Sequence, residues 1–176
     1  MNIVWEVLRE HSKAMTYRIV TYVGNDPDRF GELVKAFLEG PYRVTQRSGW
    51  PLSYCVEHHP KLIRPHLRRI IKNLETPGLH YSVKRNTIRL LQFIDVPKSL
   101  QGAVAQVCFK FLADTGEAVA VRAFSMTVLA RMAKEQPDLR KELTIIIEDQ
   151  LPYASAGFIS RASRVLKELK SNDLNT

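Results

Sequence analysis

A two-helix pattern recurs four times along this chain, and the recurrence restricts the possible folds more than any other feature of the sequence. In each copy a proline stands just before a run of apolar residues at helical spacing; these prolines are Pro27, Pro60, Pro97 and Pro137. Proline suits a helix start because its fixed φ matches helical backbone and its missing N–H is not needed in the first turn. The pattern predicts first helices at about 28–39, 62–75, 98–113 and 138–150.

A second marker keeps the same period, so the repeat does not depend on one residue type. Each first helix ends in a breaker, and the breakers are Gly40-Pro41, Thr76-Pro77-Gly78, Asp114-Thr115-Gly116, and Pro152 with Gly157. Each second helix carries an arginine near its start; these are Arg47, Arg85, Arg122 and Arg161, at separations of 38, 37 and 39 residues. Periods of this length are typical of stacked helical repeats.

These markers predict an all-α fold, a right-handed α-α superhelix of about five antiparallel helix pairs. We expect one domain over residues 1–170, in which 1–24 forms an N-terminal capping pair and 27–59, 60–96, 97–136 and 137–170 form the repeats. Ser12 is a candidate N-cap and Gly24 a candidate helix end within the capping pair. Residues 171–176 are expected to form a flexible tail. The run Thr144 to Ile147 is the best strand candidate, but it is short and lies inside a predicted helix.

The bulk composition indicates a soluble, globular, cytoplasmic protein. Of the 176 residues, 45% are hydrophobic and 25% are charged, as in ordinary folded domains. No apolar run approaches the ~20 residues needed to cross a bilayer. The N-terminus has no basic region followed by an apolar stretch, so no secretory signal is expected. Cys55 and Cys108 lie in apolar helical pattern without Cys-x-x-Cys spacing, which favours reduced core thiols.

The two-helix unit resembles the HEAT repeat. The resemblance lies in the proline before the first helix, the breaker, and a second helix that opens with valine and arginine, as in Val44-Thr45-Gln46-Arg47 and Val121-Arg122. It covers residues 28–170, and it implies an α-solenoid, HEAT- or armadillo-like, whose second helices line the concave groove. The chain also loosely resembles the short HEAT-like solenoids related to bacterial DNA-alkylation-repair glycosylases.

The HEAT resemblance further implies an aspartate, in the turn before each second helix, that pairs with the repeated arginine. The turns before Arg47, Arg85 and Arg161 contain no acid, whereas Asp114 and Glu117 precede Arg122. We therefore expect the arginines without an acid either to cap backbone carbonyl groups or to stay available for an external anion.

Positive charge is concentrated in residues 61–89. The whole chain has a net charge of +8, and this stretch carries eight basic residues and one acid. The rest of the chain is therefore close to neutral. Two interpretations stay open: the charges form a solvated face whose aliphatic stems cover apolar surface, or they bind phosphates or acidic side chains. The solenoid resemblance places Arg47, Lys84, Arg85 and Arg89 in the groove, and Lys61, Arg64, Arg68, Arg69 and Lys72 in a basic stripe on the convex face or an edge.

Two aromatic residues, Trp50 and Tyr54, lie one turn apart on a predicted second helix, close to Arg47. They are candidates for stacking against a nucleic-acid base or a peptide side chain. The alternative is that they pack in the core between repeats, where large aromatic side chains are common.

The sequence predicts no catalytic residues, no metal site and no cofactor. The glycosylase resemblance implies a cleft carboxylate that stabilises a cationic sugar, but Tyr54 stands one turn after Trp50 and Asp95 is distant. His58, His59, His66 and His80 lack the spacing of metal ligands, and phosphate-binding and dinucleotide motifs are missing. We therefore predict a non-enzymatic binding or scaffold module that presents a basic surface to an acidic partner, either protein or nucleic acid. The alternative is a DNA-binding protein related to the alkylpurine DNA glycosylases.

Overall fold

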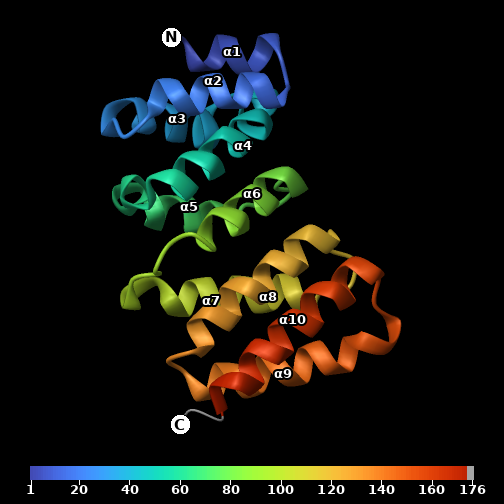
Figure 1. Ribbon diagram of the computed structural model, residues 1–176. Helices are drawn as coiled ribbons and strands as arrows, with labels where there is room; N and C mark the ends of the chain where they lie inside the picture. The colour runs from blue at the N-terminus through green and yellow to red at the C-terminus, as the bar shows by residue number, and fades with distance from the viewer. Residues whose placement is uncertain (174–176) are drawn as a thin grey trace. The chain divides into compact units, whose positions relative to one another are not determined.

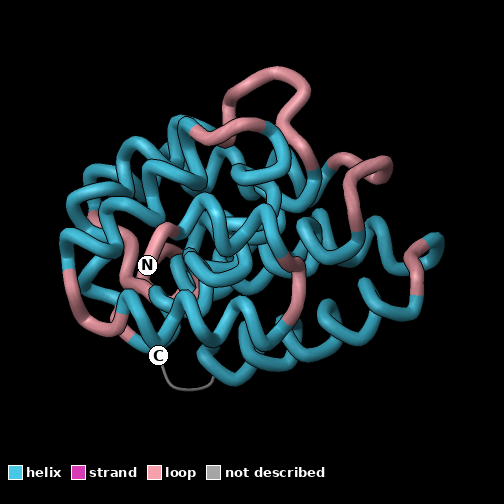
Figure 2. The backbone as a smooth tube through the Cα atoms, turned by 90° about the horizontal axis from the view of Figure 1, so that it is seen from above, coloured by secondary structure: helices cyan, strands magenta, loops and turns pink. Residues whose placement is uncertain are grey.

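The computed structural model describes residues 1–173, and within that range it contains helices and loops but no strand (Figures 1 and 2). The chain divides into two compact units, unit 1 from Met1 to Asp95 and unit 2 from Val96 onward. Each unit has its own set of fully buried apolar side chains. The division falls one residue before the predicted end of the second repeat. The expectation of one domain over 1–170 stays a prediction.

Unit 1, all of whose residues are described, contains six α-helices and one 3₁₀ helix. They are α1 (Ile3–Arg9), α2 (Lys13–Val23), α3 (Pro27–Glu39), α4 (Tyr42–His58), η1 (Pro60–His66), α5 (Leu67–Asn73) and α6 (Tyr81–Leu91). The helix α4 contacts α1, α2, α3, η1 and α6. Large side chains such as Phe37 and Leu52 are fully buried, so α4 is the element that positions the rest of the unit.

Local sequence signals set the helix ends in unit 1. The carboxylate of Asp26 accepts hydrogen bonds from two backbone N–H groups in the first turn of α3, at 2.9 and 3.1 Å, next to Pro27. Ser12 Oγ accepts a hydrogen bond from the N–H of Met15 at 3.0 Å, which confirms the predicted N-cap of α2. Gly24, with a φ of 50°, ends α2 as predicted.

The first helix of the second repeat differs from its prediction. The sequence predicts one helix over 62–75, but the chain forms the 3₁₀ helix η1 up to His66 and then the seven-residue α5. Pro65 accounts for the difference, because proline has no N–H to donate and disfavours α-helical backbone at the residue before it. Residues four apart share a face in an α-helix but not in a 3₁₀ helix. Arg68 and Lys72 therefore stack on α5, whereas Arg64 on η1 does not continue that line.

Unit 2 contains, up to residue 173, four α-helices and a short 3₁₀ helix. They are α7 (Lys98–Ala113), α8 (Val119–Ala133), α9 (Pro137–Gln150), η2 (Leu151–Tyr153) and α10 (Ala156–Asp173). The helix α8 contacts α7, α9 and α10, and most of its residues are buried, among them Val121 and Met126. The strand candidate Thr144 to Ile147 lies within α9. The helix α10 extends three residues beyond the predicted end at 170, and the rest of the predicted tail, 174–176, lies outside the described residues.

The proline markers locate the first helices well. The helices α3, α7 and α9 begin at Pro27, Lys98 and Pro137, each within one residue of its predicted start. Cys55 and Cys108 are buried free thiols, as predicted, and burial raises the pKa of each to about 12. Among residues 1–173, no helix combines the length and apolar character needed to cross a membrane.

Candidate binding surface

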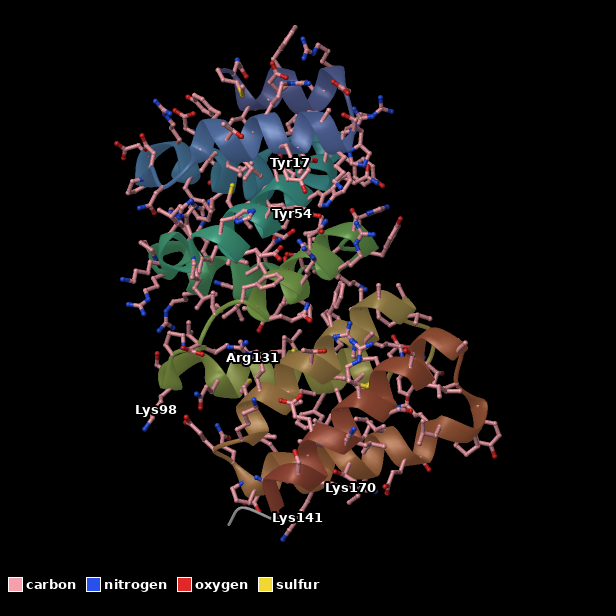
Figure 3. The ribbon with its side chains drawn as sticks, viewed as in Figure 1. Tyr17, Tyr54, Lys98, Arg131, Lys141 and Lys170 are labelled. Carbon is pink, nitrogen blue, oxygen red and sulfur yellow. The ribbon has the colours of Figure 1, made fainter. Side chains whose placement is uncertain are left out.

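Most of the side chains predicted to line a groove gather on one face of unit 1, over α2, α4 and α6. Tyr17 of α2 and Tyr54 of α4 lie side by side there (Figure 3), with ring centroids 5.7 Å apart. Ring contacts, cation–π contacts and charge interactions connect the members of this surface. We call it the aromatic–arginine face; it consists of His11, Tyr17, Arg47, Trp50, Tyr54, Arg85 and Arg89.

The helix α4 supplies the centre of this face because its sequence is amphipathic. Arg47, Trp50 and Tyr54 are half-buried and stand three and four residues apart, which aligns them along one side of an α-helix. Val44 and Leu52 point to another side and are fully buried. The same pattern that builds the core of unit 1 therefore leaves a line of partly exposed aromatic and cationic side chains.

Gly49 allows α6 to approach α4 closely. A Cβ atom at this position would lie 2.8 Å from Nδ2 of Asn86 on α6 and 3.0 Å from Cε2 of Phe37 on α3. A side chain does not fit there unless a neighbour moves. Glycine thus brings α6, with its arginines, to the edge of α4.

The aromatic residues form a connected row on this face. Trp50 lies edge-on to His11, with centroids 6.0 Å apart, and 6.3 Å from Tyr54. Trp50 and Tyr54 are half-buried, whereas 42% of Tyr17 is exposed. The two predicted roles of Trp50 and Tyr54 therefore overlap, since each packs between helices and still presents part of its ring to solvent. The sequence does not single out His11 or Tyr17, which precede the repeats.

Arg89 is engaged within unit 1. Its Nη2 donates to Oε2 of Glu57 at 2.8 Å, its Nη1 donates to Oγ of Ser53, and its guanidinium lies 4.6 Å from the ring centroid of Tyr54. A second cation–π contact, at 5.3 Å, joins it to Phe93. Arg89 is thus neutralised and held in place rather than free for a ligand. The sequence singles out neither Glu57 nor Ser53.

Arg47 caps backbone carbonyl groups, one of the two roles expected for a repeat arginine without an acid. Its Nη1 donates to the carbonyl oxygens of Val7 at 3.0 Å and Leu8 at 3.1 Å, at the end of α1. Arg85 differs, because it is half-buried and has no hydrogen bond or ion pair within residues 1–173. Lys84, the neighbour of Arg85 on α6, is half-buried and has an interaction of its own.

The charges of both repeat arginines of unit 1 affect the pKa of His11. Partial loss of solvent lowers the pKa of its imidazole, and the positive charges of Arg47 and Arg85 lower it further. Trp50 contacts the same ring and lies one turn from Arg47 on α4, and Arg85 precedes Asn86, which lies against Gly49 of α4. At neutral pH the imidazole is therefore predominantly uncharged.

The basic stripe of Lys61, Arg64, Arg68, Arg69 and Lys72 is exposed along its whole length, on η1 and α5. Arg69 forms an ion pair with Glu39 of α3. The other four have no hydrogen bond or ion pair in the described part of the chain. These side chains are solvated in this structure, and their role in binding stays a prediction.

The repeat arginines of unit 2 both have internal partners. Arg122, only 7% exposed, donates from Nη2 to Oε1 of Gln150 and lies 4.4 Å from the ring centroid of Phe158. Burial lowers the pKa of Arg122, and the charge of Asp114, one of its two candidate acids, opposes that shift. Arg161 donates to Oγ1 of Thr127 at 2.6 Å. Among the described residues, no three His, Cys, Asp or Glu side chains converge in a way that would hold a metal ion.

Comparisons with known proteins agree with the repeated two-helix pattern. The family profile described as HEAT repeat domain matches residues 6–169. No curated protein matches the chain significantly. Similarity to DNA-alkylation-repair glycosylases finds no support among these matches, and it stays a prediction.

Two solved structures share the fold at low sequence identity. One is a designed armadillo repeat protein in complex with the peptide (KR)4, with a TM-score of 0.62 and 15% identity; the match covers 95% of this chain and 80% of that one. The other is an engineered protein with a TM-score of 0.62 and 16% identity, covering 97% of this chain and 80% of the other. Together with the profile match over most of its length, these similarities show that the chain belongs to the HEAT repeat domain family and has an all-α, HEAT/armadillo-like solenoid fold.

Proposed function

We propose that this HEAT repeat chain is a non-catalytic binding module that holds an acidic stretch of another protein on the aromatic–arginine face of unit 1. The observation that carries the proposal is the row of Tyr17, Trp50 and Tyr54 on the same face as Arg47 and Arg85, over α2, α4 and α6. Tyrosine, tryptophan and arginine are the residues most enriched at the energetic centres of protein interfaces. Their rings offer a large contact area that loses little conformational freedom on binding.

The positive charge of unit 1 favours an acidic partner. Arg47, Arg85 and Arg89 are on α4 and α6, and Arg89 is ion-paired with the nearby carboxylate of Glu57. The exposed basic stripe belongs to the same unit. At physiological ionic strength the field of such charges extends over a screening length of about 8 Å. It therefore attracts an approaching acidic segment and disfavours a basic one.

The repeat architecture supports a peptide ligand. The designed armadillo protein with the similar fold is in complex with (KR)4, a basic peptide. The aromatic–arginine face of this chain is itself basic. A peptide of similar length but opposite charge, an acidic one, therefore matches it. The carboxylate of Glu57 on this face is ion-paired with Arg89, so it is not an isolated negative charge of the kind that would stabilise a cationic sugar.

The proposal is tested by fluorescence anisotropy with a labelled octapeptide (DE)4, the charge mirror of (KR)4. Neutral (SG)4 and a mixed-sequence 12-base-pair DNA duplex serve as comparison ligands at 50 mM salt. We expect saturable binding of (DE)4, no binding of (SG)4, and weaker binding of the duplex. The variant Tyr17→Ser should weaken (DE)4 binding. Tyr153→Ser in unit 2, where 92% of the tyrosine is exposed, removes the same ring elsewhere and should leave binding unchanged.

Two results would overturn the proposal. One is the absence of (DE)4 binding by the folded protein. The other is tighter binding of the duplex, with a slope of log K against log salt near about −3.6, as expected if four phosphates are each neutralised at ~0.9 per contact. That second result would make nucleic acid the ligand.

A further inference from the structure

Arg85 departs from the other repeat arginines. Arg47 donates to two carbonyl oxygens, Arg122 to the amide of Gln150 and Arg161 to a hydroxyl. Arg85 stands in the same position of its repeat, yet it has no hydrogen-bond or ion-pair partner within residues 1–173, although it is half-buried. None of its guanidinium nitrogens is among the buried atoms without a hydrogen-bond partner, so the group stays accessible to an anion from solvent. Departures from a repeated rule of this kind are expected at functional sites.

The surroundings of Arg85 are unfavourable for a cation and favourable for an anion. Arg85 lies in the N-terminal half of α6, whose first turn contains Lys84 and no acid. The N-terminal end of a helix carries positive partial charge. Arg85 precedes Asn86, which packs against Gly49 of α4, so it stands where α6 meets the helix that carries Arg47. Within the described part of unit 1, no carboxylate is bonded to Arg85, and its neighbours at the start of α6 are positive or positively polarised.

Two members of this cluster are held by contacts within unit 1. Arg47 is held by its two bonds from Nη1 to the end of α1, at 3.0 and 3.1 Å, and both bonds use the same nitrogen. His11 is held edge-on against Trp50 at 6.0 Å. Close packing at Gly49 sets the distance between α4 and α6. A ligand therefore meets two side chains that are already oriented, which reduces the entropy lost on binding.

We propose that Arg85, Arg47 and His11 form a binding site for a single oxyanion group, a carboxylate or a phosphate monoester, carried by the acidic partner. This proposal rests on the proposed function, because it names the contact that anchors the partner on the aromatic–arginine face. Guanidinium groups pair with both kinds of oxyanion through planar, charge-assisted hydrogen bonds. Trp50 lies edge-on to His11 and adds an apolar ring next to it.

Occupation of the site has a consequence for His11. In the empty site, partial burial lowers the pKa of the imidazole first, and Arg47 and Arg85 lower it further. A bound oxyanion offsets the two guanidinium charges, so it favours the imidazolium form, and binding takes up a proton. Affinity should therefore rise as pH falls through the His11 titration range. The neighbouring Glu10 keeps its negative charge there, because its hydrogen bonds with Ser12 and Arg18 lower its pKa.

The test uses the full chain and heptapeptides GSG-X-GSG, acetylated at the N-terminus and amidated at the C-terminus, in which X is glutamate, phosphoserine or glutamine. The imidazole resonances of His11, assigned with His11→Gln, report occupation of the site by NMR. We expect the glutamate or the phosphoserine peptide to shift these resonances and raise the pKa of His11, while the glutamine peptide leaves both unchanged. A response to phosphoserine alone identifies a phosphate site, and equal responses identify a site for any oxyanion; both support the proposal.

Two variants with the same charge change separate this site from a general effect of charge. Arg85→Gln should abolish the His11 response and weaken (DE)4 binding about tenfold, which is the loss of ~1.4 kcal/mol. Arg68→Gln, on α5 and outside the aromatic–arginine face, should change binding less than twofold. Arg85→Lys keeps the charge but loses the planar fork, so it should restore only part of the affinity. Circular dichroism checks that all three variants are folded.

The two proposals fail in different ways. Equal weakening by Arg85→Gln and Arg68→Gln, with an unmoved His11, would overturn this site and leave acidic-peptide binding in place. The opposite result is also possible. If the wild-type chain does not bind (DE)4, but a single oxyanion shifts the His11 resonances, the site is supported and the proposed function is overturned.

Discussion

The guanidinium of Arg122 lies over the ring of Phe158, 4.4 Å from its centroid, in the core of unit 2. The same group donates to Gln150, whose Nε2 in turn donates to the carbonyl oxygen of Leu112 at 3.1 Å. One arginine thus connects α8 to α9 and α10, and Gln150 extends the connection to α7. A buried network of this kind is costly to interrupt.

We predict that Arg122→Ala lowers the free energy of unfolding by about 2–3 kcal/mol, because it removes a cation–π contact and leaves the Gln150 amide without its donor. Arg85→Ala should change it by less than about 0.5 kcal/mol, as expected for a side chain without partners. Urea denaturation of both variants, followed by circular dichroism, measures the difference. Equal losses would show that the two repeat positions contribute alike, against this structure.

Gly49 and Gly102 should respond in opposite ways to alanine. A Cβ at Gly49 would meet Asn86 and Phe37 at 2.8–3.0 Å, so Gly49→Ala should cost about 1–3 kcal/mol by overpacking. Nothing lies within 4 Å of a Cβ at Gly102, an exposed position within α7. Gly102→Ala should therefore stabilise the protein by roughly 0.5–1 kcal/mol through helix propensity. Thermal unfolding of the two variants provides the measurement, and a stabilising Gly49→Ala would contradict the close approach of α4 and α6.

Glu57 restrains Arg89, so its removal should improve binding. We predict that Glu57→Gln raises the affinity for (DE)4 several-fold, because the variant frees the Arg89 guanidinium and removes a negative charge from the face. The ion pair is partly exposed, so stability should fall by no more than about 1 kcal/mol. Glu32→Gln on α3 gives the same change in net charge outside the face. Similar gains in the two variants would attribute the effect to net charge alone.

The buried thiols should lower the stability of the folded protein at high pH. The folded state holds the pKa of Cys55 at about 12, above its ordinary value of 9.0. Above pH 9 the unfolded chain loses this proton while the folded chain keeps it, so stability falls as pH rises from about 9 to 12. At pH 10 the loss is about 1.4 kcal/mol relative to pH 7. The stability difference between wild type and Cys55→Ala should shrink by that amount, and a difference independent of pH would contradict the raised pKa.

Much of the fold is readable from the sequence because its signals are local. A proline fixes the start of each first helix, and α3, α7 and α9 begin where expected. The change from a 3₁₀ helix to an α-helix after Pro65 also has a local cause. The spacing of apolar residues does not reveal it, because residues such as Leu62 and Ile63 suit both kinds of helix equally well. Only the hydrogen-bond pattern separates η1 from α5.

The candidate site is only partly readable, because half of it depends on contacts between distant residues. Spacing alone aligns Arg47, Trp50 and Tyr54 on α4. Arg89 meets Glu57 across 32 residues of sequence, and no local pattern reveals that this arginine is neutralised while Arg85 is not. His11 joins the site from outside the repeats. Which charge stays available is therefore decided by tertiary packing.

The bonds from Arg47 to the end of α1 also bear on how that helix is stabilised. A seven-residue helix such as α1 is too short to persist by itself in water, where roughly 12–15 residues are needed. It gains its stability from Val7, which is fully buried, and from the Arg47 donor on α4. We infer that α1 assembles only after α4 is in place, and that its backbone amides exchange with deuterium sooner than those of the helix that holds it.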